Sequence, residues 1–199
     1  MPEAPLRLAG VILAAGGSSR MGSVKQLLDI GGRTLLARTV DVVLDSGAWP
    51  VCVVLGAHAE EVRTQLTHAG ILVVDNADWR TGMASSIRAG VSAVLEASPG
   101  LEALLVTPGD LPALAAGDIV ALAGLHRSSG LVSAARYAGR LGAPAVFGRS
   151  HLGDLMNLKG DQGARRILNA DPSRVAAADL PSLAFDLDTP SDYAAWKGR

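Results

Sequence analysis

Short apolar segments alternate along the chain with longer segments whose apolar residues recur every three or four positions. The short segments are rich in Val, Leu and Ala, carry almost no charge, and have the length of single strands. Strands are therefore expected at Leu8–Leu13, Val51–Leu55, Ile71–Val74, Ala103–Thr107, Leu131–Ala135 and Ala143–Phe147. Helices are expected in the longer segments, at Thr34–Leu44, Glu60–Leu66, Ala84–Leu95 and Asp118–His126.

This alternation predicts an α/β fold: a three-layer, doubly wound, Rossmann-like arrangement with a mostly parallel sheet. Strands that are apolar on both faces need helices on both faces. In such a sheet, ligands bind beyond the carboxyl ends of the strands. Two segments of the chain lie at such ends, the glycine-rich loop after Leu13 and the turn Pro108-Gly-Asp110.

Length and composition favour one globular domain. The chain has 199 residues, of which 49% are hydrophobic and 19% charged. We expect a single domain over residues 1–199. The glycine-rich loop belongs to a first half, about 1–127. In the second half, about 128–199, Gly139, Gly142 and Pro144 interrupt the pattern, which favours a substrate-side role.

Charge and cysteine content exclude several classes of protein. A net charge of −1 gives no bulk attraction to nucleic acid or to anionic membranes. Cys52 is the chain's only cysteine, so no internal disulfide forms, which fits a reducing cytoplasm. No apolar run approaches the roughly 18 residues of a membrane span, and the first residues lack the features of a signal peptide. The prediction is a cytoplasmic protein.

The loop from Leu13 to Lys25 is the strongest candidate for a binding site. It reads Leu-Ala-Ala-Gly-Gly-Ser-Ser-Arg-Met-Gly-Ser-Val-Lys, so a strand runs directly into a turn with free backbone N–H groups and two cations, Arg20 and Lys25. Amides and cations that converge after a strand favour a polyphosphate. Neither the Walker sequence nor the dinucleotide-binding fingerprint is present. The alternative is an ordinary loop that binds nothing.

Three acidic residues are candidate metal ligands. Asp110 follows a strand in the rigid turn Thr107-Pro-Gly-Asp, where a carboxylate facing a polyphosphate would suit Mg²⁺; the alternative is a turn or helix-capping residue. Asp186 and Asp188 lie two apart in an extended segment and therefore share one face. We favour Asp188 as the second ligand. Its alternative role is that of an N-cap before Pro190. With Asp188 as the ligand, Asp186 would instead form structural hydrogen bonds.

Five further segments follow the Leu13–Lys25 loop along the chain. They are Asn76-Ala-Asp-Trp-Arg-Thr-Gly-Met-Ala-Ser-Ser86, Gly109-Asp-Leu-Pro112, Gly139-Arg-Leu-Gly-Ala-Pro144, Leu158-Lys-Gly-Asp-Gln-Gly-Ala-Arg165 and Asp186-Leu-Asp-Thr-Pro190. In content and order, the loop and these segments resemble the MobA-like nucleotidyltransferases, and among them most closely the molybdenum cofactor cytidylyltransferases.

The resemblance implies transfer of CMP from CTP to the terminal phosphate of molybdopterin that carries molybdenum, with release of pyrophosphate. Mg²⁺ is the implied cofactor, with Mn²⁺ as a substitute, and a molybdoenzyme or its chaperone would receive the product. Ala15 stands where guanylyl-transferring relatives carry Gly, which favours a cytidylyl enzyme. Ala143 departs from the pattern, because cytidylyltransferases often carry a larger polar residue there.

The resemblance also implies roles for individual residues. Catalysis falls to Arg20, Lys25 and Asp110, and the metal to Asp110, to which the spacing described above adds Asp188. The nucleotide site would be made of Leu13, Ala14, Ala15, Gly16, Gly17, Arg20, Lys25, Gly82, Met83, Ser85 and Asp110.

Other candidates have two interpretations each. Asp161 and Arg165 lie four apart at a predicted helix start, so they would form an ion pair across one turn. Alternatively, Asp161 would cap the helix, and Arg165 would bind the phosphate of the acceptor. Trp79 would stack on a base or pack in the fold. The four histidines lack zinc-ligand spacing. Rival functions are guanylyl or other nucleotidyl transfer to a different phosphorylated acceptor, and a non-catalytic carrier of the molybdenum cofactor.

Overall fold

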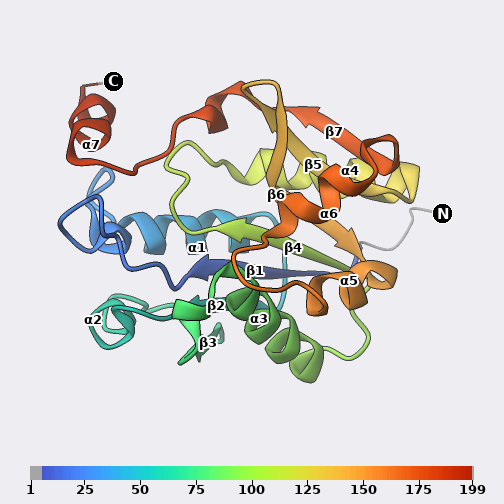
Figure 1. Cartoon of the computed structure of the whole chain (residues 1–199), viewed down its shortest axis with the longest axis horizontal. Helices are drawn as coiled ribbons and strands as arrows, with labels where there is room; N and C mark the ends of the chain where they lie inside the picture. Colours follow the sequence, from blue (N-terminus) through green and yellow to red (C-terminus); the bar gives the residue numbers. More distant parts are fainter. Residues whose placement is uncertain (1–5, 199) are drawn as a thin grey trace.

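A computed structural model describes residues 6–198. Seven strands form one sheet, and helices cover both of its faces (Figure 1). The strands are β1 (Leu8–Ala14), β2 (Val51–Leu55), β3 (Leu72–Asp75), β4 (Ala103–Pro108), β5 (Val132–Tyr137), β6 (Arg140–Gly148) and β7 (Val175–Asp179). The α-helices are α1 (Leu35–Asp45), α2 (Ala59–Arg63), α3 (Met83–Ala97), α4 (Ala116–Ser129), α5 (Leu152–Met156), α6 (Ala164–Ala170) and α7 (Pro190–Lys197). Short 3₁₀ turns lie at Lys25–Leu27, Trp79–Thr81, Arg149–His151, Pro172–Arg174 and Pro181–Ala184.

The sheet has the order β3-β2-β1-β4-β6-β5-β7. β1 pairs in parallel with β2 and β4, β2 with β3, and β5 with β7. Only β6 runs against its neighbours, since its pairs with β4 and β5 are antiparallel. The expected α/β fold with a mostly parallel, doubly wound sheet is confirmed. β1 and β4 are neighbours in the middle of the sheet, so the loops that follow them lie side by side.

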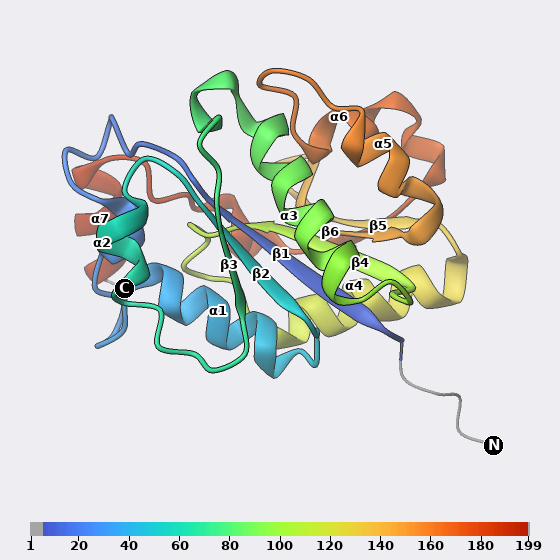
Figure 2. The ribbon, with the colours of Figure 1, turned by 90° about the horizontal axis from the view of Figure 1, so that it is seen from below.

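Two apolar layers hold the helices to the sheet. One face carries α1 and α4, with Val40 and Ile119 buried against the strands. The other face carries α3, α5 and α6, with Ile87 and Phe147 buried there. Figure 2 separates the two layers, with α3, α5 and α6 above the strands and α1 and α4 below. The strands are apolar on both faces because both faces are covered.

Each of the expected strands and helices is present, with ends that differ by a few residues. Two elements, β7 and α5, were not expected from the sequence, whereas α6 begins at Ala164, within the helix start predicted at Asp161–Arg165. β7 reads Val-Ala-Ala-Ala-Asp and its residues are mostly half-buried at the sheet edge, while α5 has five residues. Such short or alanine-rich segments carry little periodic signal.

No helix within residues 6–198 is both long enough and apolar enough to cross a membrane. Cys52 is buried in β2 and is a free thiol. Burial raises the pKa of this thiol to about 12, so it is a packing residue rather than a nucleophile.

Candidate active site

A pocket of about 720 Å³ opens at the carboxyl ends of β1 and β4. Its walls come from the loop after β1, the start of α3, the turn after β4, and segments near residues 137–143, 161–165 and 186–188. Of the predicted site residues, it is lined by Leu13, Ala14, Ala15, Gly16, Gly17, Arg20, Lys25, Gly82, Met83, Asp110 and Asp188. Residues that are far apart in the chain therefore meet in one cavity. This is the position at which open α/β sheets bind ligands.

The loop after β1 is braced from inside by two residues that sequence reasoning missed. Gln26 is buried, and its Nε2 donates to the carbonyl oxygens of Ala14 (2.8 Å) and Gly16 (3.1 Å). The Ser18 hydroxyl accepts from Lys25 N (3.1 Å) and donates to Gln26 Oε1 (3.2 Å). Because the carbonyls of Ala14 and Gly16 and the start of the 3₁₀ turn are fixed in this way, the loop keeps its shape around the pocket.

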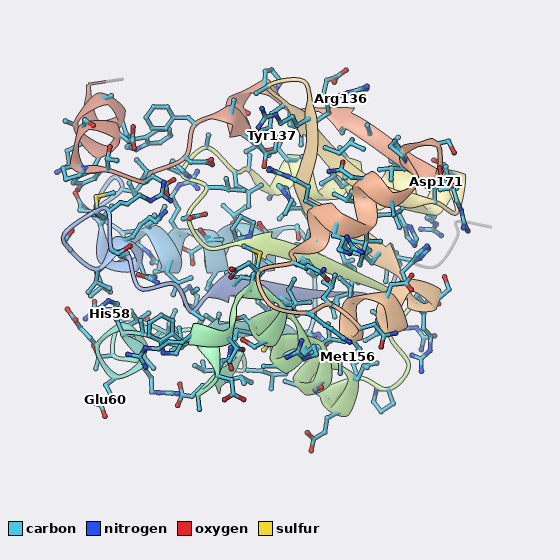
Figure 3. The ribbon with its side chains drawn as sticks, viewed as in Figure 1. His58, Glu60, Arg136, Tyr137, Met156 and Asp171 are labelled. Atoms are coloured by element: carbon cyan, nitrogen blue, oxygen red, sulfur yellow. The ribbon has the colours of Figure 1, made fainter. Side chains whose placement is uncertain are left out.

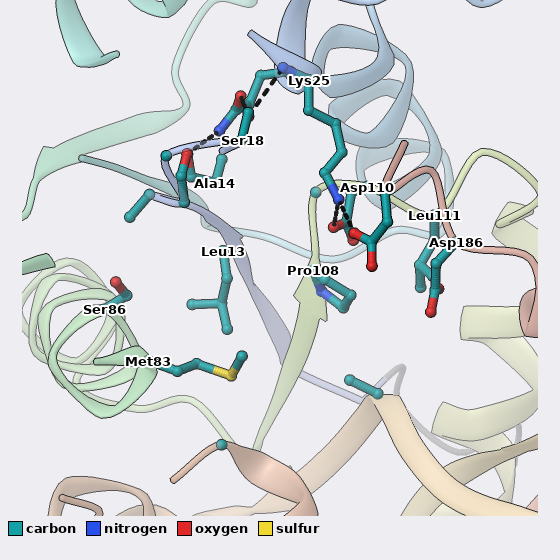
Figure 4. A pocket seen from close by; sticks show the side chains of 18 of the residues that line it. Leu13, Ala14, Ser18, Lys25, Met83, Ser86, Pro108, Asp110, Leu111 and Asp186 are labelled. Carbon is teal, nitrogen blue, oxygen red and sulfur yellow. Dashed lines mark hydrogen bonds and ion pairs between the residues drawn. The ribbon is translucent and has the colours of Figure 1, made fainter. Parts of the chain in front are cut away.

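Lys25 joins the two halves of the site. Its Nζ donates to Asp110 Oδ2 (2.8 Å) and to Asp188 Oδ1 (2.7 Å), and its side chain is only 13% exposed. Arg20 Nη2 lies 2.9 Å from Asp188 Oδ2. In Figure 4 the Lys25 side chain extends from the loop to Asp110 at the end of β4. Two carboxylates from distant segments thus converge on one cation.

The charges of this cluster support one another. Burial by itself lowers the pKa of Lys25, but the charge of Asp110 and the hydrogen bonds to both carboxylates outweigh it and leave the pKa above its ordinary value. The hydrogen bond from Lys25 lowers the pKa of Asp188, and the positive charges of Lys25 and Arg20 lower it further. Lys25 and Asp188 are therefore each held in the charged form by the other.

Asp110 and Asp188 fit a divalent cation. Their oxygens already point at one positive atom, and Mg²⁺ prefers one or two carboxylates together with phosphate oxygens. Within residues 6–198, no three His, Cys, Asp or Glu side chains gather into a metal-holding group. A metal held by this pair alone would take its other ligands from water or phosphate oxygens. Neither residue is a helix cap: Ala115 precedes α4, and Thr189 caps α7.

Asp186 also lines the pocket but is separate from the pair. It has no hydrogen-bond or ion-pair partner in the part of the chain that the structure describes, and Figure 4 shows it to one side of Asp110. Loss of hydration, with the negative charges of Asp110 and Asp188, raises its pKa. Leu187, which lies between Asp186 and Asp188 in the chain, is fully buried. In an extended segment its two neighbours point to the opposite side, so Asp186 and Asp188 share one face, as predicted.

The wall opposite the loop contains Tyr137, at the end of β5 (Figure 3). Its hydroxyl donates to the carbonyl oxygen of Ala143 (3.0 Å) and is hydrogen-bonded with Arg165. A Cβ on Gly142 would lie 2.7 Å from the Tyr137 oxygen, so glycine at this position leaves room for the Tyr137 side chain. Burial raises the pKa of Tyr137, and the charge of Asp186 raises it further. Arg165 is thereby placed at the pocket.

The start of α3 meets the loop that precedes α6. Gly82 has φ +111°, and a Cβ at this position would lie 2.3 Å from the carbonyl carbon and oxygen of Gly160. Ala84 N donates to Gly160 O (3.0 Å). Gly82 and Met83 line the pocket through this contact. A side chain at 82 would force the two segments apart.

Ser85 differs from the prediction, because it does not line the pocket. It is buried, and its hydroxyl donates to the carbonyl oxygens of Gly82 (2.8 Å) and Asp78 (3.1 Å). Asn76 Nδ2 donates to both Ser85 (2.8 Å) and Ser86 (3.0 Å). Ser86 lines the cavity instead. Ser85 therefore holds the turn, since one step along a helix rotates a side chain by about 100°.

The remaining candidates are placed as follows. α6 begins at Ala164 after Gly163, so Asp161 is not its cap, and the structure forms no ion pair between Asp161 and Arg165. Both line the pocket. Trp79 also lines it, beside Gly17, and the Arg80 guanidinium lies 4.4 Å from the centre of its ring.

Residues 10–181 match the MobA-like NTP transferase domain. The chain belongs to this family. The resemblance drawn from the motifs is thus confirmed at the level of the family. The reaction class of this family is nucleotidyl transfer from a nucleoside triphosphate.

Two relatives align over almost the whole chain. Nicotine blue oxidoreductase of Paenarthrobacter nicotinovorans is 34% identical over 194 residues, which are 92% of this chain and 92% of that protein. Purine catabolism protein PucB of Bacillus subtilis is 30% identical over 201 residues, with 94% of each chain covered.

Solved structures share the fold. A homologue of Mycobacterium tuberculosis Rv0371c from Mycobacterium sp. strain JC1 has a TM-score of 0.81 at 31% identity, covering 95% of this chain and 94% of its own. Rv0371c in complex with manganese, from Mycobacterium tuberculosis H37Rv, has a TM-score of 0.77 at 29% identity, covering 96% and 97%. A nucleotidyl transferase from Methanothermobacter has a TM-score of 0.80 at 26% identity, covering 95% of each chain.

Proposed function

We propose that this protein transfers CMP from CTP to the phosphate of molybdopterin that carries molybdenum, with release of pyrophosphate. The convergence of Asp110 and Asp188 on Lys25, beside the glycine-rich loop, carries the proposal. That cluster is suited to a nucleoside triphosphate and a divalent cation. Ala15 supports CTP over GTP, because guanylyl-transferring relatives carry Gly there.

The first half, residues 1–127, would hold the nucleotide. Leu13, Ala14, Ala15, Gly16 and Gly17 line the inner wall and would meet the base and sugar, with Gly82 and Met83 opposite. Arg20 and Lys25 would bind the triphosphate, because both project from the loop into the pocket. Loop amides and two cations together offset the charge of the phosphates.

Asp110 and Asp188 would hold Mg²⁺ or Mn²⁺. When bound, the ion neutralises phosphate charge that builds up as the bond to pyrophosphate breaks. The Mn²⁺ complex of Rv0371c supports divalent metal use in a related protein. Lys25 pairs with the two carboxylates in the described structure, so binding of substrate would exchange these partners for phosphate oxygens.

The reaction needs alignment more than proton transfer. An oxygen of the acceptor phosphate attacks the α-phosphorus of CTP, the bond from that phosphorus to the bridging oxygen breaks, and pyrophosphate leaves with the electron pair. A phosphate nucleophile is already ionised, so no general base is required. Arg20 and Lys25 would hold the departing phosphates in line with the attacking oxygen.

The second half, residues 128–199, would hold the acceptor. Arg165 faces the pocket and is fixed by Tyr137, which suits it to a phosphate. We place the reaction in the cytoplasm, with a molybdoenzyme or its chaperone as recipient of the product. The fully buried, unpaired Cys52 is compatible with that compartment.

Pyrophosphate release tests the proposal. Purified protein is supplied with CTP, GTP or UTP, with Mg²⁺ or Mn²⁺, and with or without molybdenum-loaded molybdopterin. We expect release only with CTP, metal and acceptor together. Release with GTP or UTP and a different phosphorylated acceptor would transfer the assignment to another nucleotidyl transfer. Tight cofactor binding without release from any nucleotide would identify a carrier.

An oxidoreductase activity is a second candidate, because a relative with that name is 34% identical over 92% of this chain. Oxidation of NADH or NADPH in the presence of molybdopterin or a heterocyclic dye is therefore measured beside pyrophosphate release. Nicotinamide oxidation without nucleotidyl transfer would refute the proposal. The Lys25 cluster argues for transfer, since hydride transfer has no need of two carboxylates facing a phosphate loop.

A further inference from the structure

The C-terminal arm, residues 185–198, carries Asp188 to the loop that follows β1. Figures 1 and 2 both show α7 beside that loop, away from the main layers of helices. Asp188 lies just before Thr189, the N-cap of α7. What fixes the arm therefore fixes one of the two carboxylates that face Lys25.

On one side of Asp188, an apolar anchor fixes the arm. Leu187 is fully buried in a small cluster with Met21, Ile30 and Leu35, separate from the two main apolar layers. Met21 belongs to the same loop as Arg20 and Lys25. The arm and the cation-bearing loop are thus packed together as one unit.

On the other side, the carboxylate of Asp192 holds the backbone. Asp192 Oδ2 accepts from Asp188 N (3.2 Å), from Thr189 N (2.7 Å) and from the Thr189 hydroxyl (2.7 Å). These bonds lower the pKa of Asp192, the Thr189 hydroxyl contributing most. The backbone at Asp188 is therefore fixed twice: by the buried side chain of Leu187 before it, and by the hydrogen bond from its own N–H to Asp192.

The bond to Asp188 goes beyond an ordinary helix cap, as α4 demonstrates. There Asp118 takes the same place in the first turn and accepts from the N-cap amide, Ala115 N (3.0 Å). The residue before that cap, Leu114, instead donates its N–H to Leu111 O (3.2 Å). In α7 the acid reaches one residue further back, to the residue whose side chain enters the active site.

We propose that Asp192 is a positioning residue of the metal site, which orients the Asp188 carboxylate by holding its backbone amide. This inference rests on the proposed function, because it concerns the metal that Asp110 and Asp188 would share. Asp192 itself does not line the pocket. Outer partners of metal ligands commonly matter for affinity, since they fix the ligand's orientation.

The test compares Asp192→Ala with Asp118→Ala, a matched loss of an acid from the first turn of another helix. Mn²⁺ binding is followed by electron paramagnetic resonance in the presence of a non-reactive CTP analogue. We expect the Mn²⁺ dissociation constant of Asp192→Ala to rise about tenfold. Asp118→Ala keeps the wild-type constant, and Asp192→Asn, which retains an acceptor oxygen, keeps most of the affinity. Nucleotide binding without metal is unchanged in all three.

Each outcome has one meaning. An unshifted Mn²⁺ constant in Asp192→Ala, or an equal shift in Asp118→Ala, overturns the inference. Thermal melts establish that the two alanine variants are folded. Should Asp192→Ala not fold, Thr189→Val replaces the hydroxyl that donates to Asp192 and that also caps α7. We expect this variant to bind Mn²⁺ more weakly than wild type, by a smaller factor than Asp192→Ala, and a wild-type constant there also overturns the inference. Wild-type protein that binds neither nucleotide nor Mn²⁺ refutes the proposed function instead.

Discussion

Replacing Lys25 with Met removes one charge from the centre of the site and leaves the aliphatic stem in place. The Lys25 ammonium contacts Asp110 and Asp188 at 2.8 and 2.7 Å, so the two acidic oxygens lie less than twice 2.8 Å apart. Without the cation they repel each other. Their side chains are 36% and 34% exposed, so solvent screens part of this effect. We expect a loss of about 1 to 2 kcal/mol in the free energy of unfolding at neutral pH.

The pH dependence of this loss follows from two shifted pKa values. The pKa of Lys25 is raised in the folded protein, so its contribution is present below the ordinary value of 10.5 and disappears as pH rises through the folded value. The pKa of Asp188 is lowered, so its contribution is present above 3.8 and disappears as pH falls through the folded value. The difference in unfolding free energy between wild type and variant should therefore be constant across intermediate pH and become smaller at both low and high pH.

The same variant should lose catalysis. Removal of one well-placed charge from a phosphoryl-transfer site costs about 3 kcal/mol, or roughly a hundredfold in rate. The fold remains, because Lys25 belongs to the pocket wall rather than to either apolar layer.

Urea unfolding across pH, with pyrophosphate release at saturating CTP and acceptor, measures both effects. Lys159→Met is the control for stability, because Lys159 is exposed and makes no side-chain ion pair in residues 6–198. A variant with near-normal turnover, or a stability gap as large at pH 3 as at pH 7, would refute the reasoning about the Lys25 cluster.

Three further changes test other parts of the site. Asp110→Asn should lower metal-dependent pyrophosphate release at least about a hundredfold, and normal release across a Mg²⁺ series would exclude Asp110 as a ligand. Gly82→Ala should lower the free energy of unfolding in urea by about 3 kcal/mol or more. The reason is that its Cβ would lie 2.3 Å from backbone atoms of Gly160, at a residue whose φ is +111°. Gly117→Ala, in open space on α4, is the control and should not lower it. Asp186→Asn should raise the melting temperature at pH 7, since the folded protein raises the pKa of this acid and disfavours its charge; the gain should disappear below the ordinary value of 3.8, where the acid is protonated in both states.

Much of the fold was predictable because the relevant signals are local. β1 and β2 are continuous apolar runs, and the Thr34 hydroxyl caps α1 by accepting from Ala37 N (3.2 Å), a role that Thr commonly takes. β7 was not predictable in this way. Its three alanines are half-buried at an edge of the sheet, and only pairing with β5 makes the segment a strand.

The glycine-rich loop, Arg20, Lys25 and the turn at Asp110 could be read from the chain itself, because each lies within a few residues of a strand end. Their partners could not. Spacing left Asp186 and Asp188 as alternatives, and only the burial of Leu187 against Met21, with the reach of Lys25, places Asp188 in the cluster and leaves Asp186 apart. Periodicity along one helix did not separate Ser85 from Ser86 either.

The sequence by itself determined the alternation of strands and helices, the family, and the loop that begins the site, since these depend on contacts between neighbours in the chain. The tertiary structure decided which acid meets Lys25, which serine faces the cavity, and that the arm at the far end of the chain supplies half of the carboxylate pair. Those outcomes depend on which segments, more than 80 residues apart in the chain, come together in space. The pattern of residues within one segment does not determine this.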